Sequence, residues 1–278
     1  MPKTLGVIGC GKMAYALIKG IQNTGKPLFD ELFGNDFLPE RIELFKKDFH
    51  MNHLESSEEL FAVSDVLLLA VKPQQVAGVL QKGRGMARPG QLVISIAAGV
   101  RIEDIEKELP ETAVIRVMPN TPCMVGEGVS ALAAGASVKQ EDLEIAEKLL
   151  AATGLTVVLP ETSIDAVTAL SGGGPAFVFL VAEALITAGV QVGLDAKLSR
   201  ELVVQTIRGS MKMMMETGEH PAVLREQVCS PGGTTIQGIK ALEQNKIRAA
   251  FMEAVEKAYE KSTAIGNNSK HDRGTKWD

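Results

Sequence analysis

The 278-residue chain is long enough for about two domains, and its 45% hydrophobic and 23% charged residues are typical of a globular protein. Its formal net charge of −5 argues against nucleic acid as the main partner. Three widely spaced cysteines and four scattered histidines lack the spacing of a disulfide framework or a metal site, which favours a reducing compartment and no structural metal.

No segment is expected to enter a membrane or to direct export. The longest apolar runs, DVLLLAV and AFVFLVAEALITAGV, are too short or too interrupted by Glu and Gly to span a bilayer. The start, MPKTLGVIG, carries one Lys and enters a strand at once, unlike a signal peptide. A cytoplasmic enzyme is the prediction.

Strand-like and helix-like segments alternate through roughly the first 160 residues. The apolar runs lack a polar face, as in a parallel sheet covered by helices, and they lie at 4–9, 65–71, 91–99, 113–119, 128–134 and 155–159. After about Glu161 every segment has helical period, at 163–170, 174–193, 196–217, 220–228 and 235–262. The sequence therefore predicts an α/β domain with a Rossmann-type parallel sheet at 1–162 and an all-α domain at 163–278, with a frayed end at 266–278.

The first motif is GVIGCGKMAYAL, in which Gly9, Gly11 and Ala14 form G-x-G-x-x-A between a strand and a helix. The first glycine makes the tight turn, the second lets a pyrophosphate approach the backbone, and the alanine allows close helix packing. The context favours dinucleotide binding over a merely tight turn.

An acidic residue is expected about 20 residues later, at the end of the second strand. Asp30, Glu31 and Asp36 are candidates, and ELFGND favours Asn35 and Asp36 as the strand end. Asp36 would accept a hydrogen bond from a ribose hydroxyl and favour NAD, whereas Arg41 could reach a 2′-phosphate and favour NADP. A solvated turn without a ligand is the alternative.

Two further loops follow strands where cofactor loops lie in this class of fold. AVKPQ places Ala70, Val71, Lys72 and Pro73 at the sheet edge, and MPNTP places Asn120 there. Turns bounded by proline are common after strands, so each loop taken alone favours a structural role over a functional one.

The segment SPGGTTIQGIKAL, at 230–242, puts two glycines and two threonines directly before a helical period. Such a turn is either an ordinary capped helix start or a cradle in which backbone N–H groups converge on an anion.

The ordered set GVIGCGKMA, LAVKPQ, SIAAG, RVMPNTP, DAVTALSGGGPAF and VCSPGGTTIQGIKALE resembles the pyrroline-5-carboxylate reductase family over residues 4–262. The resemblance implies reduction of 1-pyrroline-5-carboxylate to proline by NADPH, with NADH possible, in a Rossmann domain followed by a helical dimerisation domain of a homodimer or larger oligomer. It implies substrate contacts at Glu161, Ser230, Gly233, Thr234 and Thr235, with Thr235 acting on the ring nitrogen. For Glu161, an exposed acid at the start of a helix is the alternative. It implies cofactor contacts at Gly9, Cys10, Gly11, Lys12, Met13, Asn35, Asp36, Ala70, Val71, Lys72, Pro73, Ala98 and Asn120.

The chain departs from the family pattern in two places. Gly173 stands where the family usually has Ser, and Asn35 and Asp36 stand where many relatives carry a basic or hydroxyl residue for the 2′-phosphate. The choice between NADH and NADPH is therefore open at this stage.

Two other functions fit parts of the pattern. A β-hydroxyacid dehydrogenase shares the Rossmann domain but needs a lysine and an asparagine on the first interdomain helix, and 174–193 contains neither. A non-catalytic sensor of nicotinamide redox state would not require the turn at 230–235.

Overall fold

The computed structural model describes residues 4–25 and 27–271, with side chains through Gly266. The chain separates into two compact units. The first unit combines Met1–Gly173 with Ala258–Asp278, and the second is Gly174–Lys257. The predicted domains, 1–162 and 163–278, follow the change of element type and stay a prediction.

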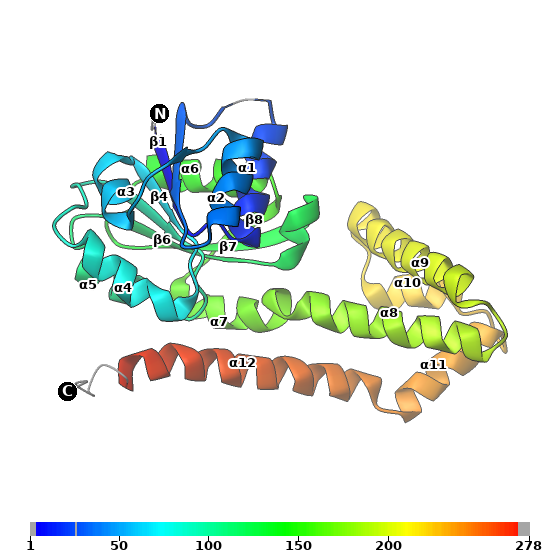
Figure 1. Cartoon of the computed structure of the whole chain (residues 1–278). Helices are drawn as coiled ribbons and strands as arrows, with labels where there is room; N and C mark the ends of the chain where they lie inside the picture. The colour runs from blue at the N-terminus through cyan, green and yellow to red at the C-terminus, as the bar shows by residue number, and fades with distance from the viewer. Residues whose placement is uncertain (1–3, 26, 272–278) are drawn as a thin grey trace. The chain divides into compact units, whose positions relative to one another are not determined.

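The first unit is built on a sheet whose strand order is β3-β2-β1-β4-β5-β6-β7-β8, flanked by helices (Figure 1). Strands β1 to β6 are parallel to one another, and their order is that of a Rossmann fold. The predicted fold class is confirmed. The strands are β1 (Thr4–Ile8), β2 (Glu31–Asn35), β3 (Asn52–His53), β4 (Val66–Leu69), β5 (Leu92–Ser95), β6 (Ala113–Pro119), β7 (Gly128–Ala134) and β8 (Gly154–Val158).

Strand β7 is antiparallel to β6, so the sheet is mixed and not wholly parallel. The connection contains only the short 3-10 helix η1 (Thr121–Val125), whereas a parallel crossover needs a dozen or more residues. Strand β8 is again parallel to β7, because α6 (Gln140–Ala151) provides the crossover.

Each face of the sheet is covered by its own helices and has its own apolar core. One core lies under α1 (Lys12–Asn23), α2 (Pro39–Phe49) and α6, and it includes the buried side chains of Leu17, Phe45 and Leu149. On the opposite face the core lies under α3 (Ser57–Val63), α4 (Pro73–Gly83) and α5 (Ile102–Glu108). Because both faces are buried, the strands read as continuous apolar runs.

Helices follow β8, as predicted. In the first unit they are the 3-10 turn η2 (Glu161–Ser163), α7 (Ile164–Val167) and the π-helical turn η3 (Thr168–Gly172). The next helices are α8 (Gly174–Gln191), α9 (Ala196–Thr217), α10 (Pro221–Val228), α11 (Thr234–Gln244) and α12 (Ile247–His271). Helices α8 and α9 approach closely, since a Cβ added at Gly189 would lie 2.6 Å from Ser199 Oγ.

Two sequence expectations for the last helices were wrong. The helix predicted at 235–262 is broken between α11 and α12, because Lys246 adopts a left-handed conformation (φ 56°). The chain is also helical as far as His271, so the expected fraying does not begin at residue 266. The rest of that expectation, at 272–278, lies outside the described residues.

The run around α8 is more apolar than expected. Of the described residues, the helical stretch Glu161–Gln191 is long and apolar enough to cross a membrane, by length and composition alone. The expectation that Glu and Gly interrupt it too much was therefore too strict. Phe179 and Leu180 are 68% and 63% exposed in the single chain, so this surface needs a cover or an apolar surrounding.

Candidate active site

The glycine turn after β1 has the geometry of a dinucleotide site. Gly9 has φ +96°, and a Cβ there would lie 2.8 Å from the carbonyl oxygen of Ala70, so only glycine fits. Gly11 has φ −75°, and a Cβ there would meet nothing within 4 Å. The first glycine is thus required by the turn, while the second leaves open space beside the backbone.

Helix α1 begins at this open space. Gly11 is its N-cap, and no side chain caps the N–H groups of the first turn. Free N–H groups and the positive end of the helix dipole bind phosphate groups. The turn and helix therefore fit the pyrophosphate of a nicotinamide dinucleotide, and Lys12 and Met13 lie in that first turn.

A cavity of about 520 Å³ lies beside the turn, at the carboxyl ends of the strands. Parallel α/β folds bind their ligands at this edge. Seven of the predicted cofactor residues line this cavity: Gly9, Gly11, Asn35, Asp36, Ala70, Val71 and Lys72.

The other predicted cofactor residues lie outside this lining. Cys10 is buried within the turn, Pro73 begins α4, and Ala98 is exposed in the loop after β5. The positions of these residues do not test whether they contact a cofactor, so the cofactor contacts stay predictions.

Asp36 is the acidic candidate that the structure places beside the glycine turn. Its Oδ2 accepts the N–H of Cys10 at 2.7 Å, and its Oδ1 accepts the N–H of Leu38 at 2.9 Å. Glu31 starts β2 and Asp30 precedes it, so both lie at the opposite end of the strand. Position alone therefore selects Asp36 from the three candidates.

Cys10 is an unreactive thiol in this environment. Its side chain is fully buried. Burial, with a smaller contribution from the Asp36 charge, raises the pKa of the Cys10 thiol to about 12. The thiol therefore stays protonated at neutral pH.

The side chain of Asn120 is held by internal hydrogen bonds. Its Oδ1 accepts the N–H of Val129 at 2.9 Å, and its Nδ2 donates to the Ser171 hydroxyl at 3.2 Å. These bonds fix the end of β6 against η3. A cofactor contact by Asn120 stays a prediction.

Glu161 is bound to a buried cation. Its Oε1 lies 3.0 Å from Arg116 Nη1 and accepts the N–H of Ile102 at 2.9 Å. Arg116 Nη2 also lies 3.9 Å from Asp165 Oδ1, and that oxygen accepts the Ser262 hydroxyl at 2.8 Å. The cluster joins β6, η2, α7 and α12 within the first unit, and a substrate contact by Glu161 stays a prediction.

Sequence reasoning missed Arg116, although a signal for it exists. AVIRVMP carries a single charge in an otherwise apolar strand, and a buried arginine needs a carboxylate partner. Several residues that line the cavity were also missed. They include Phe37 in the loop before α2, Ser57 on α3, and Gln75 and Lys82 on α4.

The turn before α11 is open to an anion. Gly232 has φ +68°, and Gly233 is the N-cap of α11 without a side-chain cap. Ser230 is exposed and Thr235 is half-buried. Within the described chain, neither hydroxyl has a hydrogen-bond partner. The uncapped helix start and the unpaired hydroxyls together suit a carboxylate with a polar neighbour.

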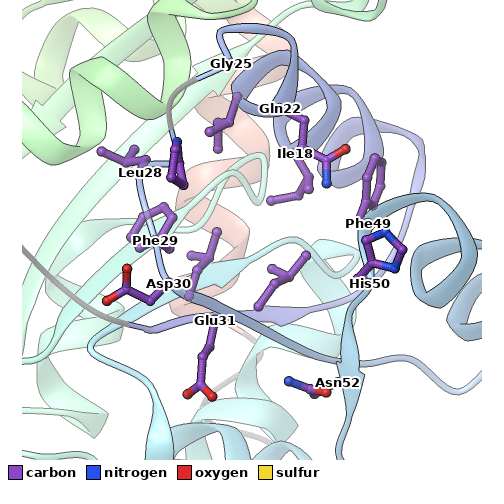
Figure 2. A pocket seen from close by; sticks show the side chains of 14 residues that line it. Ile18, Gln22, Gly25, Leu28, Phe29, Asp30, Glu31, Phe49, His50 and Asn52 are labelled. Carbon is purple, nitrogen blue, oxygen red and sulfur yellow. The ribbon is translucent and has the colours of Figure 1, made fainter.

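A larger cavity, of about 660 Å³, lies at the amino ends of β1 and β2 (Figure 2). Figure 2 shows Asp30, Glu31, His50 and Asn52 beside the apolar side chains of Ile18 and Phe49. None of the predicted cofactor residues lines this cavity. It is separate from the candidate active site.

The strand order, the glycine turn and the uncapped start of α1 define a dinucleotide-binding protein of the Rossmann class. A family model described as pyrroline-5-carboxylate reductase dimerisation matches residues 161–265. Pyrroline-5-carboxylate reductases from Synechocystis and from Methanosarcina acetivorans are each 42% identical, over 94% of this chain and 98% and 97% of their own. The chain belongs to the pyrroline-5-carboxylate reductase family.

Further similarities agree with this assignment. A family model described as NADP oxidoreductase, coenzyme F420-dependent, matches residues 4–99. The solved pyrroline-5-carboxylate reductase from Coxiella burnetii is 33% identical with a TM-score of 0.88, covering 94% of this chain and 97% of that one. The enzyme from Plasmodium falciparum, solved with NADP bound, is 36% identical with a TM-score of 0.83, covering 95% and 98%.

Proposed function

We propose that the chain reduces 1-pyrroline-5-carboxylate to proline with NAD(P)H, the last step of proline synthesis. The observation that carries the proposal is the open, uncapped turn at 230–235, inside the segment that matches the reductase family. A nicotinamide cofactor held here would supply a hydride to the carbon of the protonated imine, and the ring nitrogen would keep its proton as the C=N bond becomes a C–N bond.

The first unit binds the cofactor in this proposal. The open space at Gly11 and the free N–H groups of α1 hold the pyrophosphate, and Lys72 adds a positive charge at the end of β4. Val71, Ala98 and Asn120 belong to the loops after β4, β5 and β6 and hold the remaining parts of the cofactor.

The turn before α11 binds the substrate. The N–H groups of Gly233 and Thr234, with the Ser230 hydroxyl, bind the carboxylate, since they converge at the positive end of a helix dipole. The Thr235 hydroxyl hydrogen-bonds the ring nitrogen. No strong general acid is needed, because a protonated imine is already an electrophile, and orientation supplies the rest.

The chain works as a homodimer or larger oligomer in the cytoplasm, without nucleic acid or a membrane. The support is the match of 161–265 to a dimerisation model and the exposed apolar side chains of α8 and α9, including Phe179, Leu180 and Met215. A second copy covering this surface accounts for the apolar composition of α8 without a bilayer.

An assay on the purified full chain tests the function. Mixing it with 1-pyrroline-5-carboxylate and NADH or NADPH is expected to remove the absorbance of the reduced cofactor and to form an equal amount of proline. A chain that binds the cofactor but leaves the imine unreduced would contradict the proposal and would favour a sensor of nicotinamide redox state.

A further inference from the structure

The carboxylate of Asp36 is fixed in one orientation by two backbone donors. Cys10 N–H, from within the glycine turn, donates to Oδ2 at 2.7 Å, and Leu38 N–H donates to Oδ1 at 2.9 Å. Hydrogen bonds from N–H groups to an ionised acceptor are stronger than neutral ones. The negative charge is therefore held in place beside the turn and does not swing into solvent.

This charge lies where the adenosine ribose is expected. Strand β2 pairs with β1, so that Asn35 is the register partner of Ile8, and Asp36 and Gly11 line the same cavity. In this class of fold the residue at the end of the second strand faces the 2′ position of the ribose. A 2′-hydroxyl donates a hydrogen bond to a carboxylate, whereas a 2′-phosphate carries about two negative charges and is repelled.

Three cations, Arg41, Lys72 and Lys82, line the same cavity, but none of them cancels the repulsion between Asp36 and a 2′-phosphate. Lys82 lies 3.7 Å from Glu58, which offsets its charge. Lys72 follows β4, which lies on the other side of β1 from β2. Lys72 is therefore on the pyrophosphate side of the glycine turn and not beside Asp36. Arg41 is the third residue of α2, which begins three residues after Asp36. Within the described residues, no hydrogen bond or ion pair fixes its guanidinium as the two backbone donors fix the Asp36 carboxylate, and a guanidinium also stacks on adenine, which both cofactors share.

We infer that Asp36 makes this chain prefer NADH over NADPH, in contrast to the NADPH use that the family resemblance implies. The inference rests on the proposed function, because it concerns the cofactor of that reaction. A fixed carboxylate at the ribose selects by repulsion of the phosphate as well as by attraction of the hydroxyl.

Direct binding tests the inference without substrate. Fluorescence titration of the full chain is expected to give a Kd for NADH about 10-fold or more below that for NADPH, since like charges at a partly buried site cost at least a factor of ten. Asp36→Asn removes the charge but keeps one acceptor for the backbone N–H groups. Its NADPH-to-NADH affinity ratio should rise about 10-fold or more while its NADH affinity changes only a few fold.

Two other variants sharpen the experiment. Asp36→Ser is the second charge-free variant and should shift the ratio in the same direction. Glu40→Gln removes an exposed acid on the first turn of α2 that does not line the cavity, and its ratio should equal that of the wild type.

The outcomes separate this inference from the proposed function. A wild-type chain that binds NADPH as tightly as NADH, or a ratio unchanged in both Asp36 variants, would overturn the cofactor preference. Binding with the expected preference but without reduction of the imine would overturn the proposed function alone. A chain that binds neither cofactor would overturn both.

Discussion

Arg116 on β6 and Glu161 on η2 form an ion pair with 3.0 Å between Nη1 and Oε1, and the same Glu161 oxygen accepts the N–H of Ile102 at the start of α5. The guanidinium is buried with 6% of its side chain exposed, while Glu161 keeps 29%. Within the described cluster, two carboxylates from η2 and α7 thus balance one buried cation.

Glu161→Gln tests whether this pair is structural. We expect the free energy of unfolding to fall by about 1 to 3 kcal/mol, less than for a fully buried pair because Glu161 is partly solvated. If the pair is only structural, kcat/KM should stay within a few fold. Denaturant unfolding and steady-state kinetics on the same variant distinguish a structural role from a substrate contact. Unchanged stability with a tenfold or larger loss of kcat/KM would place Glu161 at the substrate.

The two glycines of the turn should respond differently to alanine. Gly9→Ala forces a Cβ against Ala70 at positive φ and should cost about 1 to 3 kcal/mol of stability. Gly11→Ala meets no protein atom but fills the space left for the pyrophosphate, so it should keep its Tm and lose about 10-fold or more in NADH affinity. Cofactor binding by Gly11→Ala as tight as the wild type would exclude a ligand from that space.

The cysteines should differ sharply in reactivity. Because the pKa of Cys10 is raised from 9.0 to about 12, its thiolate is about 1000-fold rarer at neutral pH than that of an ordinary thiol. Iodoacetamide should therefore label half-buried Cys229 and spare Cys10, and labelling beside Ser230 should slow turnover by crowding. Peptide mapping with activity measured in parallel checks this, and full activity after complete labelling of Cys229 would contradict it.

The same pKa predicts a pH dependence of stability. A thiol whose pKa is higher in the folded chain stabilises it fully below the unfolded value of about 9, and that contribution is lost as the pH rises towards 12. The difference in unfolding free energy between the wild type and Cys10→Ala should be constant below pH 9 and should shrink above it. A difference that does not change with pH would show that Cys10 keeps an ordinary pKa.

The apolar surface of α8 should hold two copies together. Leu180→Glu puts a charge on this surface and should convert a dimer or larger oligomer to a monomer at micromolar concentration, as measured by sedimentation. Val63→Glu is the matched control, because Val63 is 41% exposed in the first unit. A wild-type chain that sediments as a monomer would contradict the proposed assembly.

The Rossmann unit could be predicted because its signals are local. Gly9 and Gly11 lie between a strand and a helix, and the apolar runs of β1, β4, β5 and β6 are buried on both faces, so turn chemistry and periodicity agree. The antiparallel direction of β7 was missed because an apolar run does not show in which direction its strand lies in the sheet. Only the short connection through η1 indicates that direction. The break at Lys246 was missed because lysine seldom adopts positive φ, and nothing in NKIR signals it.

The candidate site could be predicted only in part. Residues that follow strands, such as Asp36 and Lys72, are placed by the sheet itself. Ser57 and Gln75 reach the cavity through the packing of α3 and α4, which sequence periodicity does not specify. The pairing of Arg116 with Glu161 joins residues 45 apart in the chain, and it depends on the tertiary fold.

The central claim is that the turn before α11 binds the substrate and that the Thr235 hydroxyl holds the ring nitrogen. The most direct test is to measure kcat/KM of Thr235→Ala and to record the Tm of the same protein. One side-chain hydrogen bond to a charged or buried partner is worth roughly 1 to 3 kcal/mol, so the variant should lose about 10- to 100-fold in kcat/KM. Its Tm and NADH affinity should match the wild type, and Thr235→Ser should keep most of the activity because it retains the hydroxyl. A Thr235→Ala chain that is stable and fully active would contradict the account.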